Sequence, residues 1–185
     1  RAAKRDGVDV TCETAPHYLV LDDSDLREDG RFKMNPPLRG REDREALIEG
    51  IKDGTIDIIA TDHAPHAAWE KAREFELAPF GTTGIECALG LVLTKLVEAG
   101  TIDYARMVEL MSVNPRRILG VEPASIAAGS VADITVFDPA ATWTVGADGY
   151  ESKADNCAFE GVELTGRATD VFVGGVRTLA DGVVC

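Results

Sequence analysis

The residues whose types and spacing could carry chemistry lie in segment 56–66, Ile-Asp-Ile-Ile-Ala-Thr-Asp-His-Ala-Pro-His. Its apolar, β-branched first half predicts a buried strand. A carboxylate and two imidazoles follow directly, at Asp62, His63 and His66. The carboxyl end of a strand in a parallel α/β sheet is where ligands bind and reactions take place. The segment therefore indicates a hydrolase-like site that uses a metal ion or acid–base catalysis.

Asp62 is the strongest catalytic candidate, because a carboxylate can ligate a divalent metal and can also carry a proton. The alternative is a turn former, since Asp-x-x-Pro favours turns. His66 follows Pro65, which restrains the backbone, and a rigidly held imidazole suits recognition of a carboxylate or acyl oxygen; a surface histidine is the alternative. His63 is explained equally well by a structural role.

Further candidates stand on other loops. His17 follows Pro16 at a strand-to-loop transition, where a metal ligand and a core histidine are both reasonable interpretations. Asn35 precedes two prolines, and its amide could donate to and accept from an amide-like substrate; a turn asparagine is the alternative. Arg39 fits the solvated start of a helix. At Phe80-Gly81 the glycine permits close approach of the backbone to a ligand.

A helix that leads into a strand must position this chemistry. Residues 41–52 predict an amphipathic helix, and the strand at 56–60 follows it, which is the order that a parallel sheet requires. The loop at 62–83 is long enough to be functional. The remaining α/β elements are expected as a strand over 8–13, a loop with His17 over 14–21, and helices over 85–99, 103–112 and from Pro115 onward.

The pattern changes after Gly120. Short strands between Gly, Pro and Asp turns are predicted at 130–137, 142–145, 163–167, 170–174 and 177–179. We therefore expect an α/β part over 1–119 and a small β domain over 120–185. The chain also starts as if in the middle of a βα unit, so we expect it to be the C-terminal part of a longer protein.

Composition excludes several classes of function. The 185 residues carry a formal net charge of −13, which argues against a nucleic-acid or anionic-membrane partner. No apolar run is long enough for a transmembrane helix, and the first residues, Arg-Ala-Ala-Lys-Arg-Asp-Gly, do not have the pattern of a signal peptide. The cysteines are scattered and predict neither a disulfide framework nor a cysteine zinc site. A cytoplasmic location is the expectation.

Several motifs together resemble the dihydroorotases of the long bacterial class, over nearly the whole chain. They are Cys-Glu-Thr-Ala-Pro-His at 12–17, Lys-Met-Asn-Pro-Pro-Leu-Arg at 33–39, Ile-Ile-Ala-Thr-Asp-His-Ala-Pro-His at 58–66, Gly-Ile-Glu at 84–86, the segment 112–120, and Ala-Asp-Ile-Thr-Val-Phe-Asp at 132–138. The Asn-Pro-Pro-Leu-Arg and Asp-His-Ala-Pro-His motifs are the more specific ones. The last two segments are shared by cyclic amidohydrolases in general.

The resemblance implies a zinc enzyme that reversibly cyclises N-carbamoyl-L-aspartate to L-dihydroorotate in de novo pyrimidine biosynthesis. The implied fold is the C-terminal part of a (β/α)₈ TIM barrel of the metal-dependent hydrolase type, plus part of a small β-sandwich built from both chain ends. By motif position, Asp62 would ligate metal and act as general acid/base. Asn35, His66 and the Phe80-Gly81 backbone would contact substrate, and His17 has no ligand role in that pattern.

The same resemblance places most ligands of a two-zinc site upstream of this chain. We therefore expect residues 1–185 alone to be inactive, and the complete enzyme to be a homodimer or to associate with aspartate transcarbamoylase. Two alternatives remain open. One is another cyclic amidohydrolase, an allantoinase or a dihydropyrimidinase. The other is a non-catalytic dihydroorotase-like subunit that serves as a scaffold for the transcarbamoylase.

Overall fold

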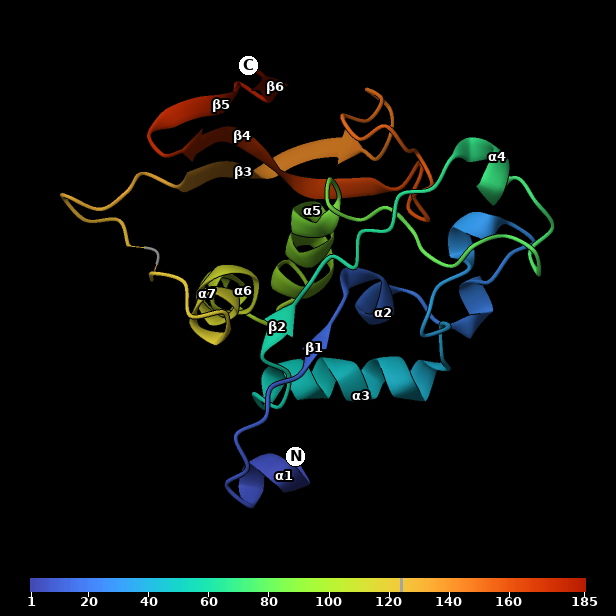
Figure 1. Ribbon diagram of the computed structural model, residues 1–185, viewed down its shortest axis with the longest axis horizontal. Coiled ribbons are helices and arrows are strands. Elements are labelled where there is room, and N and C mark those ends of the chain that lie inside the picture. The colour runs from blue at the N-terminus through green and yellow to red at the C-terminus, as the bar shows by residue number, and fades with distance from the viewer. Residues whose placement is uncertain (124) are drawn as a thin grey trace. The chain divides into compact units, whose positions relative to one another are not determined.

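Short elements joined by long loops make up the computed structural model, which describes residues 1–123 and 125–185 (Figure 1). The chain is mixed α/β, as predicted, and divides into two units. The first contains residues 1–88 and 144–162, and the second contains residues 89–143 and 163–185. The domain division predicted near residue 120 stays a prediction. Within the described residues no helix is both long and apolar enough to span a membrane.

Two short parallel strands carry the candidate site in the first unit. β1 (Glu13–Thr14) lies beside β2 (Ile58–Ile59), with Glu13 opposite Ile58 (Figure 1). α3 (Arg41–Lys52) precedes β2 and buries Gly50 and Ile51, which confirms the predicted helix and its order before a parallel strand. α2 (Pro16–Val20) follows β1 and contacts α3.

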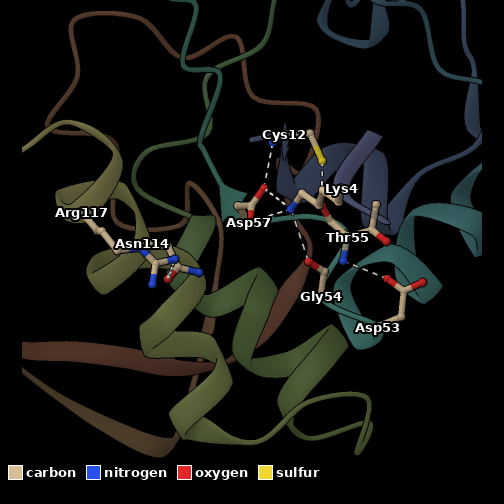
Figure 2. Close-up of polar contacts among 8 residues, drawn as sticks. All are labelled: Lys4, Cys12, Asp53, Gly54, Thr55, Asp57, Asn114 and Arg117. Atoms are coloured by element: carbon tan, nitrogen blue, oxygen red, sulfur yellow. Dashed lines mark hydrogen bonds and ion pairs between the residues drawn. The ribbon is translucent and has the colours of Figure 1, made fainter. Parts of the chain in front are cut away.

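A polar cluster fixes the amino-terminal ends of these strands (Figure 2). The Asp57 carboxylate accepts the Cys12 backbone N–H at 2.9 Å and pairs with the Lys4 ammonium at 2.6 Å. Lys4 comes from α1 (Ala2–Arg5), so the ion pair ties the segment before β1 to the residue before β2. Because the pair is partly buried, solvent screens it less than an exposed pair.

Loops of the first unit fold over an apolar cluster of Phe32, Met34, Leu38 and Ala158, with Tyr18, Leu21 and Phe75 packed against it. Short helices in these loops are η1 (Asp23–Asp25), η2 (Gly30–Phe32) and α4 (Ala68–Lys71). Burial of this cluster holds the loop that contains Asn35 in place, since Met34 and Leu38 flank it inside the core.

The second unit begins with helices that each continue into a wider π turn. α5 (Ala88–Val92) runs into η3 (Leu93–Val97), and α6 (Tyr104–Val108) runs into η4 (Glu109–Val113). α7 (Asn114–Ile118) follows, and its Arg117 guanidinium donates to the Asn114 side-chain oxygen at 2.9 Å (Figure 2). These findings confirm helices near all three predicted places, with breaks in regularity that periodicity does not predict.

A sheet in the order β3-β4-β5-β6 completes the second unit (Figure 1). The strands are β3 (Ile134–Thr144), β4 (Glu163–Val173), β5 (Val176–Ala180) and β6 (Val183–Val184). β4 and β5 are antiparallel and are joined by Gly174-Gly175, both at positive φ, as a tight hairpin turn requires. η3 contacts β4, where Gly166 has φ +91° and leaves room for the Leu93 side chain.

Several predicted bounds are wrong. The predicted strand over 8–13 is paired only at its end, and the strand over 56–60 is reduced to Ile58–Ile59. The segments predicted as separate strands at 130–137 and 142–145 form one long strand, β3. Those predicted at 163–167 and 170–174 form another, β4. β3 tolerates Pro139 because β3 lies at the edge of the sheet, where a residue without a backbone N–H can be accommodated without the loss of an inter-strand hydrogen bond.

Candidate functional site

Asp62 and His17 meet at the carboxyl ends of the two parallel strands. Asp62 follows β2 and His17 follows β1, and the Asp62 Oδ2 atom lies 3.6 Å from His17 Nε2. The imidazole is 2% exposed, whereas the carboxylate is 53% exposed. Asp62 also adopts φ +49°, a left-handed conformation that is uncommon outside glycine and frequent at functional sites. One solvent-facing acid and one buried base therefore share this end of the sheet.

Burial controls the ionisation of this pair. Desolvation lowers the pKa of His17 to about 4, so the imidazole is neutral at pH 7. Desolvation also raises the pKa of Asp62 above its ordinary value. The Tyr18 ring lies against the His17 ring in a tilted arrangement, with centroids 4.1 Å apart, and the pKa of Tyr18 rises to about 12 through burial and the nearby Asp62 charge. Neutral imidazole and carboxylate are the forms in which these groups bind a metal.

The pair has the chemistry of part of a metal site. His17 Nε2 is buried and has no hydrogen-bond partner among the described residues, which is unusual for a buried nitrogen. Two donors on one tetrahedral zinc ion lie about 3.4 Å apart when each bond is about 2.1 Å, close to the separation of this pair. Within residues 1–123 and 125–185 no group of three or more candidate ligands converges. Further donors would have to come from elsewhere.

His63 has a structural position. Its Nδ1 atom accepts the backbone N–H groups of Gly84 and Ile85, at 3.2 and 3.3 Å. His63 also forms an isolated parallel β-bridge with Thr82 through the backbone. The ring thus holds the segment 82–85 against the segment after β2, which supports the structural interpretation of this histidine.

His66 and Phe80-Gly81, which are predicted to contact substrate, lie next to each other. His66 Nε2 lies 2.8 Å from the Phe80 carbonyl oxygen, to which it donates as the Nε2–H tautomer, and Nδ1 faces Glu70 at 3.9 Å. Gly81 donates its N–H to the Lys33 carbonyl at 2.8 Å. A Cβ at Gly81 would stand 2.4 Å from the Ala64 Cβ, so only glycine fits there. Contact of these groups with substrate stays a prediction.

Asn156, which sequence reasoning missed, clamps the two loops together. This side chain is 2% exposed. Its Oδ1 accepts the His66 backbone N–H at 2.9 Å, and its Nδ2 donates to the Ala64 carbonyl at 3.0 Å and to Gly81 at 3.4 Å. The Asn156 carbonyl also accepts the Thr83 N–H at 3.1 Å. No local pattern could have revealed this role, because the partners lie at least 73 positions away.

Lys71 is a second residue that the motifs did not indicate. Its ammonium donates to the carbonyls of Pro79 and Gly81, at 2.9 and 2.6 Å, and the residue is 6% exposed. Burial lowers the pKa of Lys71 to about 8 despite the nearby Asp29 charge. Lys71, on α4, therefore holds the Gly81 carbonyl in place, while the Gly81 N–H is bound by the Lys33 carbonyl.

Asn35 lies exposed on a loop that is tied to the same region. The Tyr18 hydroxyl donates to the Pro36 carbonyl at 2.8 Å, so the residue next to His17 anchors the residue next to Asn35. Arg39 is 71% exposed and lies 3.8 Å from Asp43 one helical turn on, which agrees with a solvated helix start. Asn35 is therefore held near the Asp62–His17 end of the sheet without a fixed side-chain role.

Comparison with known proteins shows which family the chain resembles. The model of the amidohydrolase family matches residues 2–178. The dihydroorotase of Geobacter metallireducens is 52% identical over 176 residues, which cover 95% of this chain and 41% of that protein. The dihydroorotase of Chlorobaculum tepidum is 47% identical over 175 residues, 93% of this chain and 40% of that protein. The chain thus spans about two-fifths of the length of these curated relatives.

Solved structures of hydantoinases and dihydropyrimidinases match the fold of this chain over about two-fifths of their own length. The L-hydantoinase (dihydropyrimidinase) from Arthrobacter aurescens superposes with a TM-score of 0.90 at 29% identity, covering 100% of this chain and 42% of that one. The dihydropyrimidinase from Brevibacillus agri gives a TM-score of 0.90 at 27% identity, covering 99% and 42%. With a family model that spans almost all of its residues and with these close relatives, the chain belongs to the amidohydrolase family.

Proposed function

We propose that this chain is part of a dihydroorotase, the enzyme that reversibly cyclises N-carbamoyl-L-aspartate to L-dihydroorotate in pyrimidine biosynthesis. The observation that carries the reaction type is the Asp62 carboxylate facing an unpartnered, buried imidazole nitrogen at the ends of two parallel strands. The choice of substrate is supported by the 52% identity to a dihydroorotase, against 29% to a hydantoinase. A −13 charge is compatible with an anionic substrate if the pocket opposes it locally.

Asp62 would have two tasks in this reaction. Its half-exposed carboxylate can reach both a metal and a substrate, and its raised pKa makes it a better proton acceptor than an ordinary aspartate. His17 would be the second donor to the metal, although the sequence resemblance assigns it no such role. Bound there with further ligands, zinc would polarise the amide carbonyl and acidify water.

Substrate contacts are proposed for Asn35, His66 and the Phe80-Gly81 backbone. The Asn35 amide can serve both a ring N–H and a carbonyl, because it donates and accepts. In the present geometry the His66 ring donates to the Phe80 carbonyl, so it would contact the substrate together with that backbone. The clamp at Asn156 would keep the three groups in register.

The complete protein would have the architecture of its relatives. We propose that β1 and β2 are two strands of a (β/α)₈ barrel, that residues 1–119 belong to that barrel, and that residues 120–185 supply the C-terminal half of a composite β-sandwich. Two zinc ions, homodimerisation and association with aspartate transcarbamoylase belong to the same proposal. The 185 residues alone would be inactive, because no third candidate ligand joins Asp62 and His17 among the residues that the structure describes.

The test is to assay the full-length protein against dihydroorotate, allantoin and dihydrouracil and to measure its bound metal. We expect turnover of dihydroorotate and at least one divalent ion per chain, with the His17→Gln variant losing metal while the exposed Arg39→Gln variant retains it. A preference for dihydrouracil or allantoin would indicate that the protein is a dihydropyrimidinase or an allantoinase instead. A folded protein with less than one ion per chain and no turnover would support the scaffold alternative.

A further inference from the structure

Cys87 and Cys157 form a buried pair of thiols that the reaction proposed for Asp62 does not use. Their Sγ atoms are 3.9 Å apart, and the residues are 2% and 1% exposed. Cys87 lies immediately before α5, and Cys157 follows Asn156 in the irregular segment between β3 and β4. Both remain thiols in the structure. Seventy positions of sequence separate two sulfur atoms that are in van der Waals contact.

The two thiols are not equivalent. The Cys87 S–H bond to Cys157, followed by the Phe159 backbone N–H, lowers the pKa of Cys157 to about 7 against the opposing effect of burial. The same hydrogen bond between the two thiols, together with burial, raises the pKa of Cys87. The Gly84 carbonyl oxygen, 3.5 Å from the Cys87 sulfur, competes with Cys157 for the one Cys87 proton. Cys157 is thus the thiol that ionises first, with a protonated partner beside it.

We propose that Cys87 and Cys157 are an oxidation site that closes into an intramolecular disulfide when the protein meets a hydroperoxide. A disulfide bond is about 2.05 Å long, so closure needs a relative movement of about 2 Å by two sulfur atoms already in contact. Both lie on backbone outside the regular interior of a helix or sheet, where such a shift is tolerated best. This proposal does not depend on the reaction proposed for Asp62.

The chemistry balances with hydrogen peroxide as the oxidant. The Cys157 thiolate attacks one peroxide oxygen, the O–O bond breaks, and hydroxide leaves to give a sulfenic acid at Cys157. The Cys87 sulfur then attacks the sulfenic sulfur, the S–O bond breaks, and water leaves with the Cys87 proton. The proton first lost by Cys157 neutralises the hydroxide. Two thiols lose two electrons and two protons, and one peroxide becomes two waters.

The bridge would join two segments that both belong to the loop clamp. Cys157 is bonded directly to Asn156, which binds His66 and Ala64 through its side chain. Cys87 lies three residues after Gly84, whose N–H is held by His63. Oxidation would therefore add a covalent tie where the folded chain relies on hydrogen bonds, and would restrain the unfolded chain as well.

Peptide mapping of the full-length protein tests the proposal. The folded protein is treated with hydrogen peroxide, its remaining thiols are alkylated, and it is digested with trypsin. Cleavage after Arg73, Lys95, Lys153 and Arg167 yields peptides 74–95 and 154–167, which contain only Cys87 and only Cys157. We expect these two peptides to appear joined, about 2 Da lighter than their sum, and to separate again after dithiothreitol.

Single variants separate this pathway from incidental oxidation. In Cys87→Ala, the sulfenic acid at Cys157 has no partner and should be trapped by dimedone; in Cys157→Ala, Cys87 should stay reduced. The exposed cysteines Cys12 and Cys185 are the matched controls, and replacing either by alanine should leave the bridge intact. The proposal fails if peptides 74–95 and 154–167 stay reduced in the folded wild-type protein while Cys12 oxidises, or if the bridge forms only in urea.

Discussion

Removing the Asn156 side chain should loosen the loops on which the substrate contacts are proposed. In Asn156→Ala, the His66 N–H and the Ala64 carbonyl lose partners at 2.9 and 3.0 Å. Each buried group left without a partner costs about 1–3 kcal/mol, and the partial exposure of both loops favours the lower half of that range. We therefore expect local opening to become easier by about 2–4 kcal/mol. The 3.4 Å contact with Gly81 is too long to add much.

Hydrogen exchange of the full-length protein measures this directly. A change of about 2–4 kcal/mol corresponds to exchange that is about 30- to 800-fold faster at the His66 amide. Asn156→Asp should be worse than alanine at pH 7, because it places a carboxylate oxygen against the Ala64 and Gly81 carbonyls in place of a donor. Lowering the pH should partly rescue that variant, since a protonated carboxyl can donate.

Asn35→Ala is the matched control, because Asn35 is an exposed asparagine on a neighbouring loop. It should leave the exchange of the His66 amide unchanged. Protection at His66 within threefold of wild type in both Asn156 variants would refute the clamp, and the loops would then have to be held mainly by Lys71 and His63. An equal loss of protection across all of α3 would indicate global unfolding in place of local opening.

Three further outcomes follow from the geometry. Asp62→Asn should lower kcat of the full-length protein about 10²- to 10⁴-fold with an unchanged circular dichroism spectrum, because in the proposed reaction this half-exposed side chain carries the proton transfers. Gly81→Ala should destabilise by about 2–4 kcal/mol in urea unfolding, from the clash with Ala64 and the positive φ, whereas Gly54→Ala, with open space around it, should cost about 1–2 kcal/mol; equal losses would contradict the clash. Burial lowers the pKa of Lys71 from 10.5 to about 8. Between pH 8 and 10.5 the unfolded chain therefore binds more protons at this lysine than the folded chain does. The contribution of Lys71 to the free energy of unfolding consequently rises with pH over this range. Denaturation curves from pH 7.5 to 10.5 should lose this slope in Lys71→Met, and a slope that persists would contradict the assignment.

The elements that sequence predicts best are those decided by local chemistry. The helix over 41–52 is confirmed because its apolar and charged faces alternate at the helical period. The sequence predicts a break in β3 around Pro139, which normally interrupts a strand, and a break in β4 at 168–169, just after Gly166. In the structure Pro139 is on an edge strand, and Gly166 makes room for Leu93. Tertiary neighbours decide both cases, and no local rule contains them.

The candidate site shows the same division between local and distant information. That Asp62 and His17 come close could be expected, because both follow strands whose carboxyl ends meet at one edge of a parallel sheet. The motif resemblance argued against a ligand role for His17, whereas its unpartnered Nε2 atom argues for one. Asn156 and Lys71 could not be inferred, since they act on backbone atoms that belong to other segments.

Closeness in sequence proved a poor guide to closeness in space for the Asp62, His63 and His66 cluster. The left-handed backbone at Asp62 turns the chain immediately after β2. Asp62 then faces His17, the His63 ring receives the N–H groups of Gly84 and Ile85, and the His66 ring reaches the Phe80 carbonyl. Three residues that resemble a ligand cluster thus have three separate positions: Asp62 is half exposed and faces His17, and the two histidines hold neighbouring loops. A metal site at this end of the sheet consequently requires donors from other strands, and the histidines nearest to Asp62 in sequence cannot supply them without dismantling those loops.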